Sequence, residues 1–242
     1  MNNIIEVKDL YKAFDDLEIL KGVDMHLGQG ENLGILGKSG MGKSVLTKCI
    51  VRLLEPDYGI VRVLGKDILA MNDSELNKIR EKIGYLFQGG ALYDSMSVRE
   101  NLEFPIRRTQ MSNNKAEVDE MIERALNSVG LLDAIDKIPS ELSGGMKKRI
   151  GLARALILKP KVILYDEPTT GLDSVTAGEI SELIVRVQKE YQAASIIVTH
   201  DMKCAQITTN RIQILDEGNF IAEGTYNELS KSSEPKVKAF FS

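Results

Sequence analysis

The most informative residues of this chain are Gly37-Lys38-Ser39-Gly40-Met41-Gly42-Lys43-Ser44. This stretch fits the pattern G-x-x-x-x-G-K-[ST] without a gap, which is typical of a loop that wraps around phosphate groups. The residues Leu33-Gly34-Ile35-Leu36 before it predict a short buried strand, and apolar residues at near-helical spacing predict a helix over residues 44–54. The alternative is a Gly-rich turn that binds nothing, and the strand-loop-helix context disfavours it.

The loop predicts how a nucleotide is bound. Glycines let successive backbone N–H groups face inward, and the following helix adds its partial positive charge. Lys43 is then expected to reach the β- and γ-phosphates, and the Ser44 hydroxyl to ligate Mg²⁺. We expect the following residues to bind ATP: Gly37, Lys38, Ser39, Gly40, Met41, Gly42, Lys43, Ser44 and Val45.

A second element is the run Val162-Ile163-Leu164-Tyr165-Asp166-Glu167, in which apolar residues end in two carboxylates. This is typical of a buried parallel strand whose C-terminal end opens on a ligand crevice. Asp166 is expected to hold Mg²⁺, directly or through water, and Glu167 to polarise the attacking water. Taken alone, two acidic residues at a strand end are as often ordinary surface charge as a functional site. The phosphate-binding loop elsewhere in the chain favours the catalytic interpretation.

Composition limits the classes of function. With 242 residues and 43% hydrophobic content, the chain has the size of one nucleotide-hydrolysing unit. Its 31 basic and 35 acidic residues give no overall excess of positive charge of the kind expected for a nucleic-acid-binding protein, so no nucleic-acid partner is expected. Cys49 and Cys204 lack metal-ligand spacing and predict reduced, interior thiols in a cytoplasmic protein. No secretory leader and no window of about 18 apolar residues is present, so any membrane role is expected to act through a partner.

The first part of the chain predicts antiparallel strands over residues 4–33, joined by a polar turn around Asp15-Asp16. Within them, either Tyr11 or Phe14 is a candidate to offer its ring to adenine, although most such aromatics are simply core. A further strand is predicted over residues 59–65 and a helix over residues 74–82. A strand over residues 83–87 then ends at Gln88.

Residues 89–157 predict an inserted helical subdomain, in which residues 117–129 form an amphipathic helix and Pro105 punctuates the chain. The segment Leu142-Ser143-Gly144-Gly145-Met146 opens another helix. The backbone N–H groups at the start of this helix suggest a binding site for an anion. The alternative is a capped helix with nothing bound. Apolar side chains that look exposed suggest a groove for a membrane partner, unless they pack inside the subdomain: Ala91, Leu92, Tyr93, Met96 and Phe104.

The last part of the chain predicts a helix over residues 175–190, a buried strand over residues 194–199 and a hairpin over residues 211–223. A helical tail closes the sequence. His200 follows the second of these strands, on the side expected for Asp166 and Glu167. A lone histidine is more often structural, but this position favours a role beside the two carboxylates.

Taken in chain order, these residues resemble the nucleotide-binding subunit of ATP-binding cassette (ABC) transporters over nearly the whole chain. Phe14 corresponds to the adenine-stacking aromatic and residues 37–44 to the phosphate loop. Gln88 matches the glutamine that meets the metal and the γ-phosphate. Residues 142–146 match the signature loop, so the resemblance implies that Ser143, Gly144 and Gly145 contact nucleotide.

The later motifs extend the resemblance. Asp166 matches the metal-binding carboxylate and Glu167 the catalytic one, Asp173 the dimer-contacting loop and His200 the switch histidine. Most members of the family have glutamine where this chain has Met146. This difference puts in doubt the contact that the glutamine side chain makes, but not the anion site itself.

The resemblance implies an α/β fold: a P-loop NTPase core with a mostly parallel sheet, an N-terminal antiparallel β subdomain and an inserted α-helical subdomain. One cassette would then span residues 1–242, with residues 1–88 and 158–242 as the core and residues 89–157 as the helical part. It also implies a head-to-tail homodimer with two composite ATP sites, each closed by the signature loop of the other copy.

Finer similarity in residues 88–98, in the Leu-Ser-Gly-Gly-Met signature and in residues 235–241 resembles the Mla-type ATPases. These drive phospholipid transport with integral permeases and Mce-domain proteins, which implies a position on the inner face of the membrane. An importer for amino acids or other small solutes is the rival. Ribosome-remodelling and DNA-repair ATPases need a second cassette or a long coiled coil, and a small-molecule kinase leaves Gln88, His200 and the signature unexplained.

Overall fold

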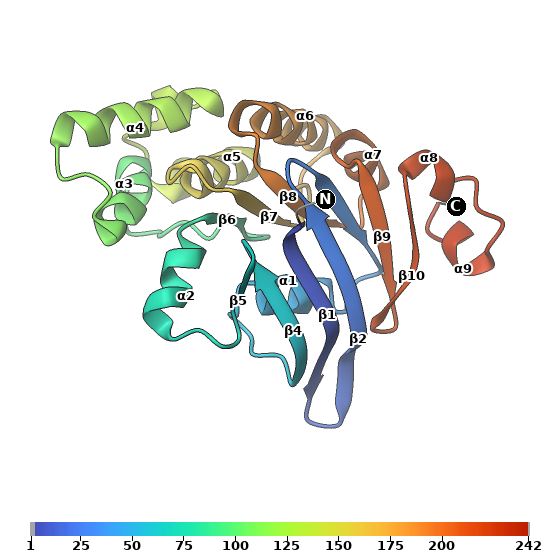
Figure 1. Ribbon diagram of the computed structural model, residues 1–242. Coiled ribbons are helices and arrows are strands. Elements are labelled where there is room, and N and C mark those ends of the chain that lie inside the picture. The colour runs from blue at the N-terminus through green and yellow to red at the C-terminus, as the bar shows by residue number, and fades with distance from the viewer. Residues whose placement is uncertain (1–2, 242) are drawn as a thin grey trace.

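The computed structural model describes residues 3–241, and within them the strands form two sheets (Figure 1). The strands are β1 (Asn3–Phe14), β2 (Leu17–Gly28), β3 (Asn32–Leu36), β4 (Tyr58–Val63), β5 (Lys66–Asp67), β6 (Ile83–Leu86), β7 (Val162–Asp166), β8 (Ala194–Thr199), β9 (Arg211–Asp216) and β10 (Asn219–Gly224).

Helices lie on both sides of the larger sheet. They are α1 (Lys43–Ile50), α2 (Asp73–Arg80), α3 (Val98–Thr109), α4 (Lys115–Ser128), α5 (Gly144–Leu156), α6 (Ser174–Tyr191), α7 (Met202–Thr208), α8 (Tyr226–Leu229) and α9 (Pro235–Lys238), with the 3-10 turns η1 (Leu132–Ala134) and η2 (Pro139–Glu141). Within residues 3–241, no helix is both long and apolar enough to cross a membrane.

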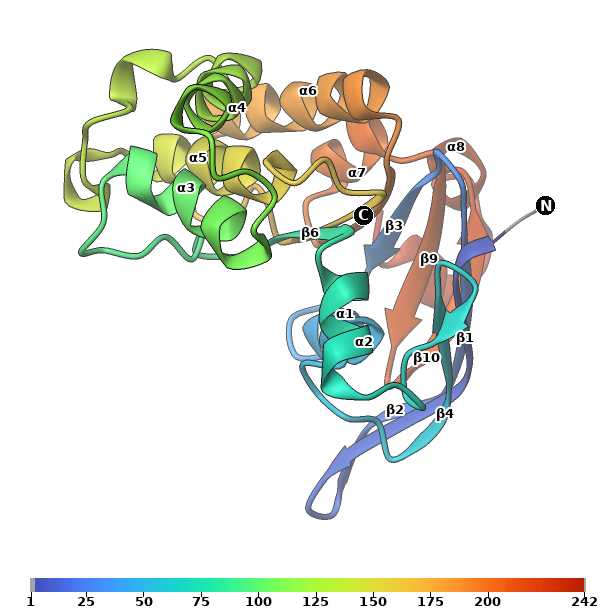
Figure 2. The same ribbon diagram turned by 60° about the vertical axis from the view of Figure 1, so that its left-hand side comes forward.

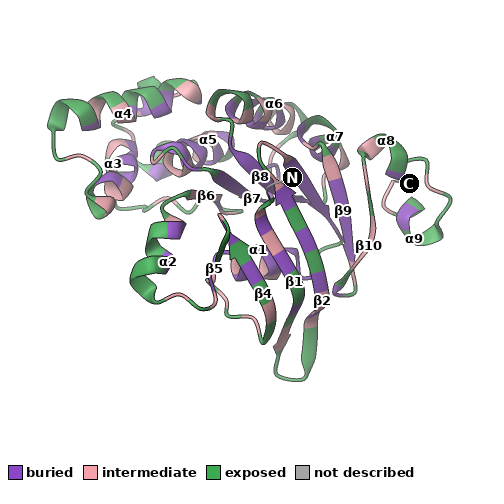
Figure 3. Ribbon diagram, in the orientation of Figure 1, coloured by how far each residue is buried: buried purple, intermediate pink, exposed green. Residues whose placement is uncertain are grey.

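The larger sheet has the strand order β10-β9-β3-β8-β7-β6, and all its neighbours are parallel except β10 and β9. Every residue of β3, β7 and β8 is buried, which explains why these strands are continuous apolar runs (Figure 3). Parallel strands end at one edge of a sheet, so the segments after β3, β6, β7 and β8 meet there. The predicted parallel core is confirmed.

The smaller sheet is antiparallel, with the order β2-β1-β4-β5. The turn predicted around Asp15-Asp16 is confirmed, since β1 ends at Phe14 and β2 begins at Leu17. Helix α1 packs between the two sheets (Figure 2), and its Leu46 and Ile50 belong to a core shared by both. Cys49, on the same helix, is buried and free, as is Cys204, and burial raises the pKa of each thiol to about 11.

The opposite face of the larger sheet is covered by α6 and α7, and the chain between β6 and β7 forms α3, α4 and α5 beside them (Figures 1 and 2). Apolar residues of α3, α4, α5 and α6 share one core with β7 and β8. The amphipathic helix predicted over residues 117–129 is present as α4, which begins earlier because the Asn114 side chain accepts a hydrogen bond from the Ala116 N–H.

Two predictions of local structure were wrong. Pro105 lies inside α3 instead of interrupting it, although a proline removes one helical N–H bond. The helix predicted over residues 44–54 ends at Ile50, because the chain turns back at Arg52, which adopts a left-handed φ of 50°.

The segment expected to expose an apolar groove is only partly exposed. Tyr93 is 45% exposed and its ring packs against Phe104, with the ring centroids 5.0 Å apart. Leu92 is half-buried and packs against the core of the helices, so the expectation that it is exposed was wrong. Met96 and Phe104 are also half-buried, whereas Ala91 is exposed.

Candidate nucleotide site

The loop between β3 and α1 has the backbone that its glycines predict. Gly42 adopts a φ of 92°, a conformation that residues with a Cβ rarely take. Gly37 packs so closely on β9 that a Cβ there would lie 2.6 Å from the Leu215 carbonyl oxygen. The loop therefore depends on glycine at both ends, and α1 begins directly behind it at Lys43.

Lys43 lies beneath this loop. Its Nζ donates hydrogen bonds to the carbonyl oxygens of Gly37, at 2.7 Å, and Lys38, at 3.0 Å. It also lies 3.6 Å from Glu167 Oε1. Burial lowers the pKa of this ammonium group, and the neighbouring carboxylates oppose that shift. A buried cation beneath a loop of backbone amides is suited to bind phosphate oxygens.

Ser44 and Asp166 come together from α1 and the end of β7. The Ser44 hydroxyl donates a 2.8 Å hydrogen bond to Asp166 Oδ1. Burial raises the pKa of Asp166, and the bond from Ser44 partly offsets this effect. A hydroxyl and a carboxylate are hard oxygen ligands of the kind that Mg²⁺ takes, with phosphate and water completing its octahedron. The two residues therefore fit the predicted metal.

Glu167 is held in an unusual conformation. Its φ is 51°, in the left-handed region, and its N–H donates a 2.9 Å bond to the Val198 carbonyl oxygen on β8. Such a backbone costs about 1 kcal/mol or more and persists only where the surroundings fix it. The carboxylate Oε2 contacts His200 Nδ1 at 2.8 Å and accepts a 3.0 Å bond from Thr170 Oγ1.

The side chains of Lys43, Ser44 and Glu167 open on a cavity of about 670 Å³. It is lined by residues of the loop, of the strand ends and of the β1–β2 hairpin: Phe14, Ile19, Lys38, Ser39, Gly40, Gly42, Lys43, Ser44, Val45, Gln88, Glu167, Thr170 and His200. Most of the predicted site residues therefore meet at one place, although they come from distant parts of the sequence.

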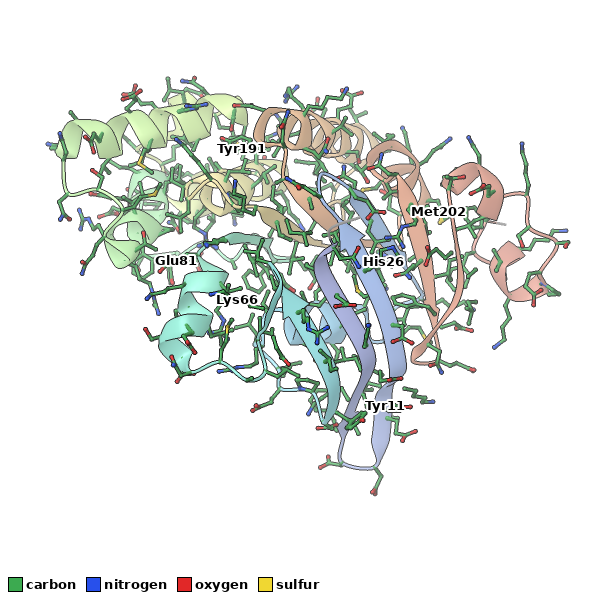
Figure 4. All side chains as sticks on the ribbon, viewed as in Figure 1. Tyr11, His26, Lys66, Glu81, Tyr191 and Met202 are labelled. Carbon is green, nitrogen blue, oxygen red and sulfur yellow. The ribbon has the colours of Figure 1, made fainter. Side chains whose placement is uncertain are left out.

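The structure distinguishes between the two candidate aromatics. Phe14 lines the cavity and its side chain is 43% exposed. Tyr11 instead packs edge-on against Tyr58, with ring centroids 6.2 Å apart, and lies on β1 in the lower part of Figure 4. Of the two aromatics, Phe14 is therefore the one that lines the cavity, and Lys12 Nζ lies 5.4 Å from the centroid of its ring.

The signature residues lie apart from this cavity. Ser143 caps α5 by accepting a hydrogen bond from the Met146 N–H at 3.3 Å, as the capped-helix alternative predicts. Ser143 and Gly144 are exposed, and Gly145 packs on the start of α6, where an added Cβ would lie 2.6 Å from Thr176 Cγ2. The Met146 side chain packs on the helical core, and Asp173 caps α6.

Three residues at the site were not predicted from the sequence: Ile19, Thr170 and Lys148. Thr170 bonds the Glu167 carboxylate from only three residues away. Lys148 lies on α5 with 5% exposure, and its Nζ donates to the carbonyl oxygens of Gln88 and Glu167. The sequence does contain a signal for Lys148. This lysine shares one helical face with Gly151, Leu152 and Ala155, and a lysine is unusual on such an apolar face.

Comparison with known proteins identifies the family. The family model described as ABC transporter matches residues 20–170. The chain belongs to the ABC transporter family. As the ATP-binding domain of this family, it binds and hydrolyses ATP, and the resemblance drawn from its motifs is confirmed.

Relatives of this ABC ATPase match it over almost its full length. It is 39% identical to protein trigalactosyldiacylglycerol 3, chloroplastic, of Arabidopsis thaliana, over 98% of this chain and 73% of that protein. It is 36% identical to the methionine import ATP-binding protein MetN of Clostridium tetani, over 97% of this chain and 73% of that protein.

A solved relative has the same fold. This is the ATP-binding cassette MJ0796, a dimer bound to ADP and Pi, which aligns with a TM-score of 0.84 and 31% identity over 92% of this chain and 98% of that one. The predicted cassette architecture is thereby confirmed.

Proposed function

We propose that Glu167 orients and activates the water that attacks the γ-phosphate, while Lys43 and Ser44 hold ATP and Asp166 holds the metal. The observation that supports this most directly is the convergence of Lys43, Glu167 and His200 on one cavity wall. Phosphoryl transfer depends mostly on positioning and electrostatics, so a preorganised carboxylate is what the reaction needs.

Each residue of the site would have a separate role in binding ATP or in its hydrolysis. Bound Mg²⁺ would neutralise charge on the phosphates. Lys43 would bind the β- and γ-phosphates, and Phe14 would stack on adenine. His200 and Thr170 would keep the Glu167 carboxylate aimed at the water, since each contacts Oε2. Gln88 would complete the metal and γ-phosphate contacts from the end of β6.

We further propose a homodimer in which Ser143, Gly144 and Gly145 of one copy close the ATP site of the other. Their position outside their own cavity supports this, since Ser143 and Gly144 are exposed at the start of α5, where backbone N–H groups favour phosphate, while Gly145 packs on α6 beside them. The dimeric cassette MJ0796 gives further support. A two-fold axis would create two equivalent sites.

The proposed cargo is phospholipid, moved between bacterial membranes. Support comes from the similarity to a chloroplast protein that carries the name of a galactolipid, together with the Mla-like segments of the sequence. An importer for amino acids or another small solute is the alternative, which the similarity to MetN favours.

The proposed setting is the inner face of the cell membrane, where integral permease subunits would bind the ATPase and an Mce-domain protein would carry lipid. Residues 89–157 are proposed as the helical subdomain that transmits ATP binding to the permease. Residues 1–88 and 158–242 would form the nucleotide-binding core.

The test of cargo is purification of the protein from its own membranes with its bound permease, followed by reconstitution into vesicles. Lipid transport predicts ATP-dependent exchange of labelled phospholipid between vesicles and no methionine uptake. ATP-dependent methionine uptake without lipid exchange would favour the importer. A Glu167→Gln complex is the control for ATP dependence in both assays.

A further inference from the structure

Lys148 is a buried cation close to the catalytic carboxylates. It lies in the second turn of α5 and is 5% exposed. A lysine is almost never buried this deeply unless its ammonium group is hydrogen-bonded and its charge is balanced. The neighbouring residue, Lys147, is only half-buried, and within residues 3–241 its side chain forms no hydrogen bond. Deep burial is therefore confined to the face of α5 that carries Lys148.

The partners of Lys148 are two backbone carbonyl oxygens from different strands. Its Nζ donates to Gln88 O, just beyond β6, and to Glu167 O at 3.0 Å, just beyond β7. Burial lowers the pKa of the ammonium group, and the carboxylates of Asp166 and Glu167 oppose this shift. The cation is therefore balanced by the same acids that serve the site.

The rest of this helical face also contacts the segment after Gln88. Gly151 packs so closely that an added Cβ would lie 2.9 Å from Gly90 O. Arg154 Nη1 donates a 2.8 Å hydrogen bond to the Ala91 carbonyl oxygen. Lys148, Gly151 and Arg154 are spaced to lie along one side of α5, so the helix contacts residues 88–91 over two turns.

Lys148 also bonds a residue whose backbone needs support. The φ of 51° at Glu167 directs its carboxylate toward His200 and Lys43, and Lys148 fixes the carbonyl of that same residue. Removal of this bond would take away the side-chain donor that Lys148 supplies to the Glu167 carbonyl. A small change in the direction of the carboxylate is enough to slow a positioned reaction.

We propose that Lys148 is a positioning residue for ATP hydrolysis, which links the helix behind the signature serine to both Gln88 and Glu167 and sets the direction of the Glu167 carboxylate. Because α5 begins at the signature loop, Lys148 connects the helix behind that loop to the two strand ends. This inference rests on the proposed catalytic role of Glu167.

The test compares Lys148→Met, Lys148→Arg and wild type, with kcat, KM for ATP, the Kd of an ATP analogue and Tm measured on the full chain. Lys148→Met keeps the length and apolar stem but loses the donor, so kcat should fall about tenfold or more while KM, Kd and Tm change little. Lys148→Arg, which retains a cation and several donors, should recover most of that loss.

Lys189→Met, at an exposed position of α6, controls for loss of a lysine charge and should match wild type. Wild-type kcat in Lys148→Met, or parallel losses of kcat, ATP affinity and Tm, would overturn the proposal. Glu167→Gln is measured alongside. If that variant keeps wild-type turnover, the proposed catalytic site itself is wrong, whereas an inactive Glu167→Gln with a fully active Lys148→Met rejects only the role of Lys148.

Discussion

His200 Nδ1 lies 2.8 Å from Glu167 Oε2, although the two residues are separated by the whole of α6 and β8. The contact follows from parallel pairing of β7 and β8, in which Asp166 lies opposite Val198. The residues just beyond each strand are therefore neighbours. The other carboxylate oxygen, Oε1, faces Lys43 Nζ at 3.6 Å, so Glu167 is held between a histidine and a buried cation.

The first prediction concerns His200. Replacement by alanine removes one of the two side-chain contacts to Glu167 Oε2, and ATP turnover should fall about 100-fold or more, as for loss of a group that supports proton transfer. ATP binding should persist. The matched control is His26→Ala, since His26 is the other histidine of the sequence and its exposed side chain lies on β2, outside the cavity. Turnover near the wild-type rate in His200→Ala would contradict the assignment.

The second prediction separates binding from chemistry. Glu167→Gln should retain ATP and accumulate as a nucleotide-bound dimer, because it loses only the charge needed for water activation. Lys43→Ala should bind nucleotide poorly, because it loses the cation beneath the phosphate loop. Turnover, ATP-analogue affinity and sedimentation give the comparison. Normal hydrolysis by Glu167→Gln would remove this carboxylate from the mechanism.

The third prediction tests the composite site. In a heterodimer of one Ser143→Arg copy and one Lys43→Ala copy, both defects fall in the same site and the other site stays intact. Residual hydrolysis should appear in the mixture although each variant homodimer is inactive. A mixture as inactive as its parents, with heterodimers demonstrated by differential tags, would argue against sharing of the signature loop, and so would full activity of Ser143→Arg alone.

The fourth prediction concerns docking to a permease. Tyr93, at 45% exposure, is the largest exposed apolar side chain in the segment that follows Gln88. Tyr93→Asp should leave the ATPase rate of the isolated protein nearly unchanged but weaken co-purification with an integral membrane partner at least about tenfold, as for loss of an aromatic anchor.

Met111→Asp is the matched control for Tyr93→Asp, because Met111 is 47% exposed in the connection between α3 and α4. Leu92→Asp is unsuitable, since Leu92 packs on the helical core and a charge there should impair folding. Equal recovery of the membrane partner by the Tyr93→Asp and Met111→Asp proteins would locate the docking surface elsewhere.

The fifth prediction concerns stability and pH. Arg211 donates to Glu31 Oε1 at 2.7 Å and to the carbonyl oxygen of His26, labelled in Figure 4, at 2.8 Å, which ties β9 to the start of β3 and the end of β2. Burial alone would raise the pKa of Glu31, but the hydrogen bonds from Arg211 and the Gly28 N–H outweigh it and lower the pKa.

Because the folded-state pKa of Glu31 is lowered, its stabilising contribution is present above the ordinary pKa of 4.5 and is lost as pH falls through the folded value. Glu31→Gln should therefore lower the free energy of unfolding at pH 7 by about 1–3 kcal/mol, the range for charged hydrogen bonds. The difference from wild type should shrink below pH 4.5 in denaturant titrations.

Glu223 provides the comparison for Glu31, because it also bonds Arg211, at 2.9 Å, but its side chain is 44% exposed. Glu223→Gln should cost less than about 1 kcal/mol, since solvent screens an exposed ion pair. A Glu31→Gln effect that is equally small, or independent of pH, would show that the half-buried pair of Arg211 and Glu31 does not stabilise the junction.

Local pattern alone was enough to predict much of this fold. The spacing of Gly37, Gly42 and Lys43 specifies a loop between a strand and a helix, because both its turn and its helix N-terminus are built from consecutive residues. Continuous apolar runs predict β7 and β8, since strands buried on both faces carry no polar alternation. The roles assigned to Gln88, Glu167 and His200 stay predictions, but their positions follow from where those strands end.

Tertiary packing determines which groups from distant parts of the chain meet. Phe14 instead of Tyr11 faces the cavity because the twist and register shifts of β1 set the direction of each side chain. Leu92 is covered because helices from later in the chain pack over it. Lys148 reaches Gln88 and Glu167 because α5 packs across the ends of two strands. Such contacts depend on the packing of elements far apart in sequence, and no local pattern of residues encodes them.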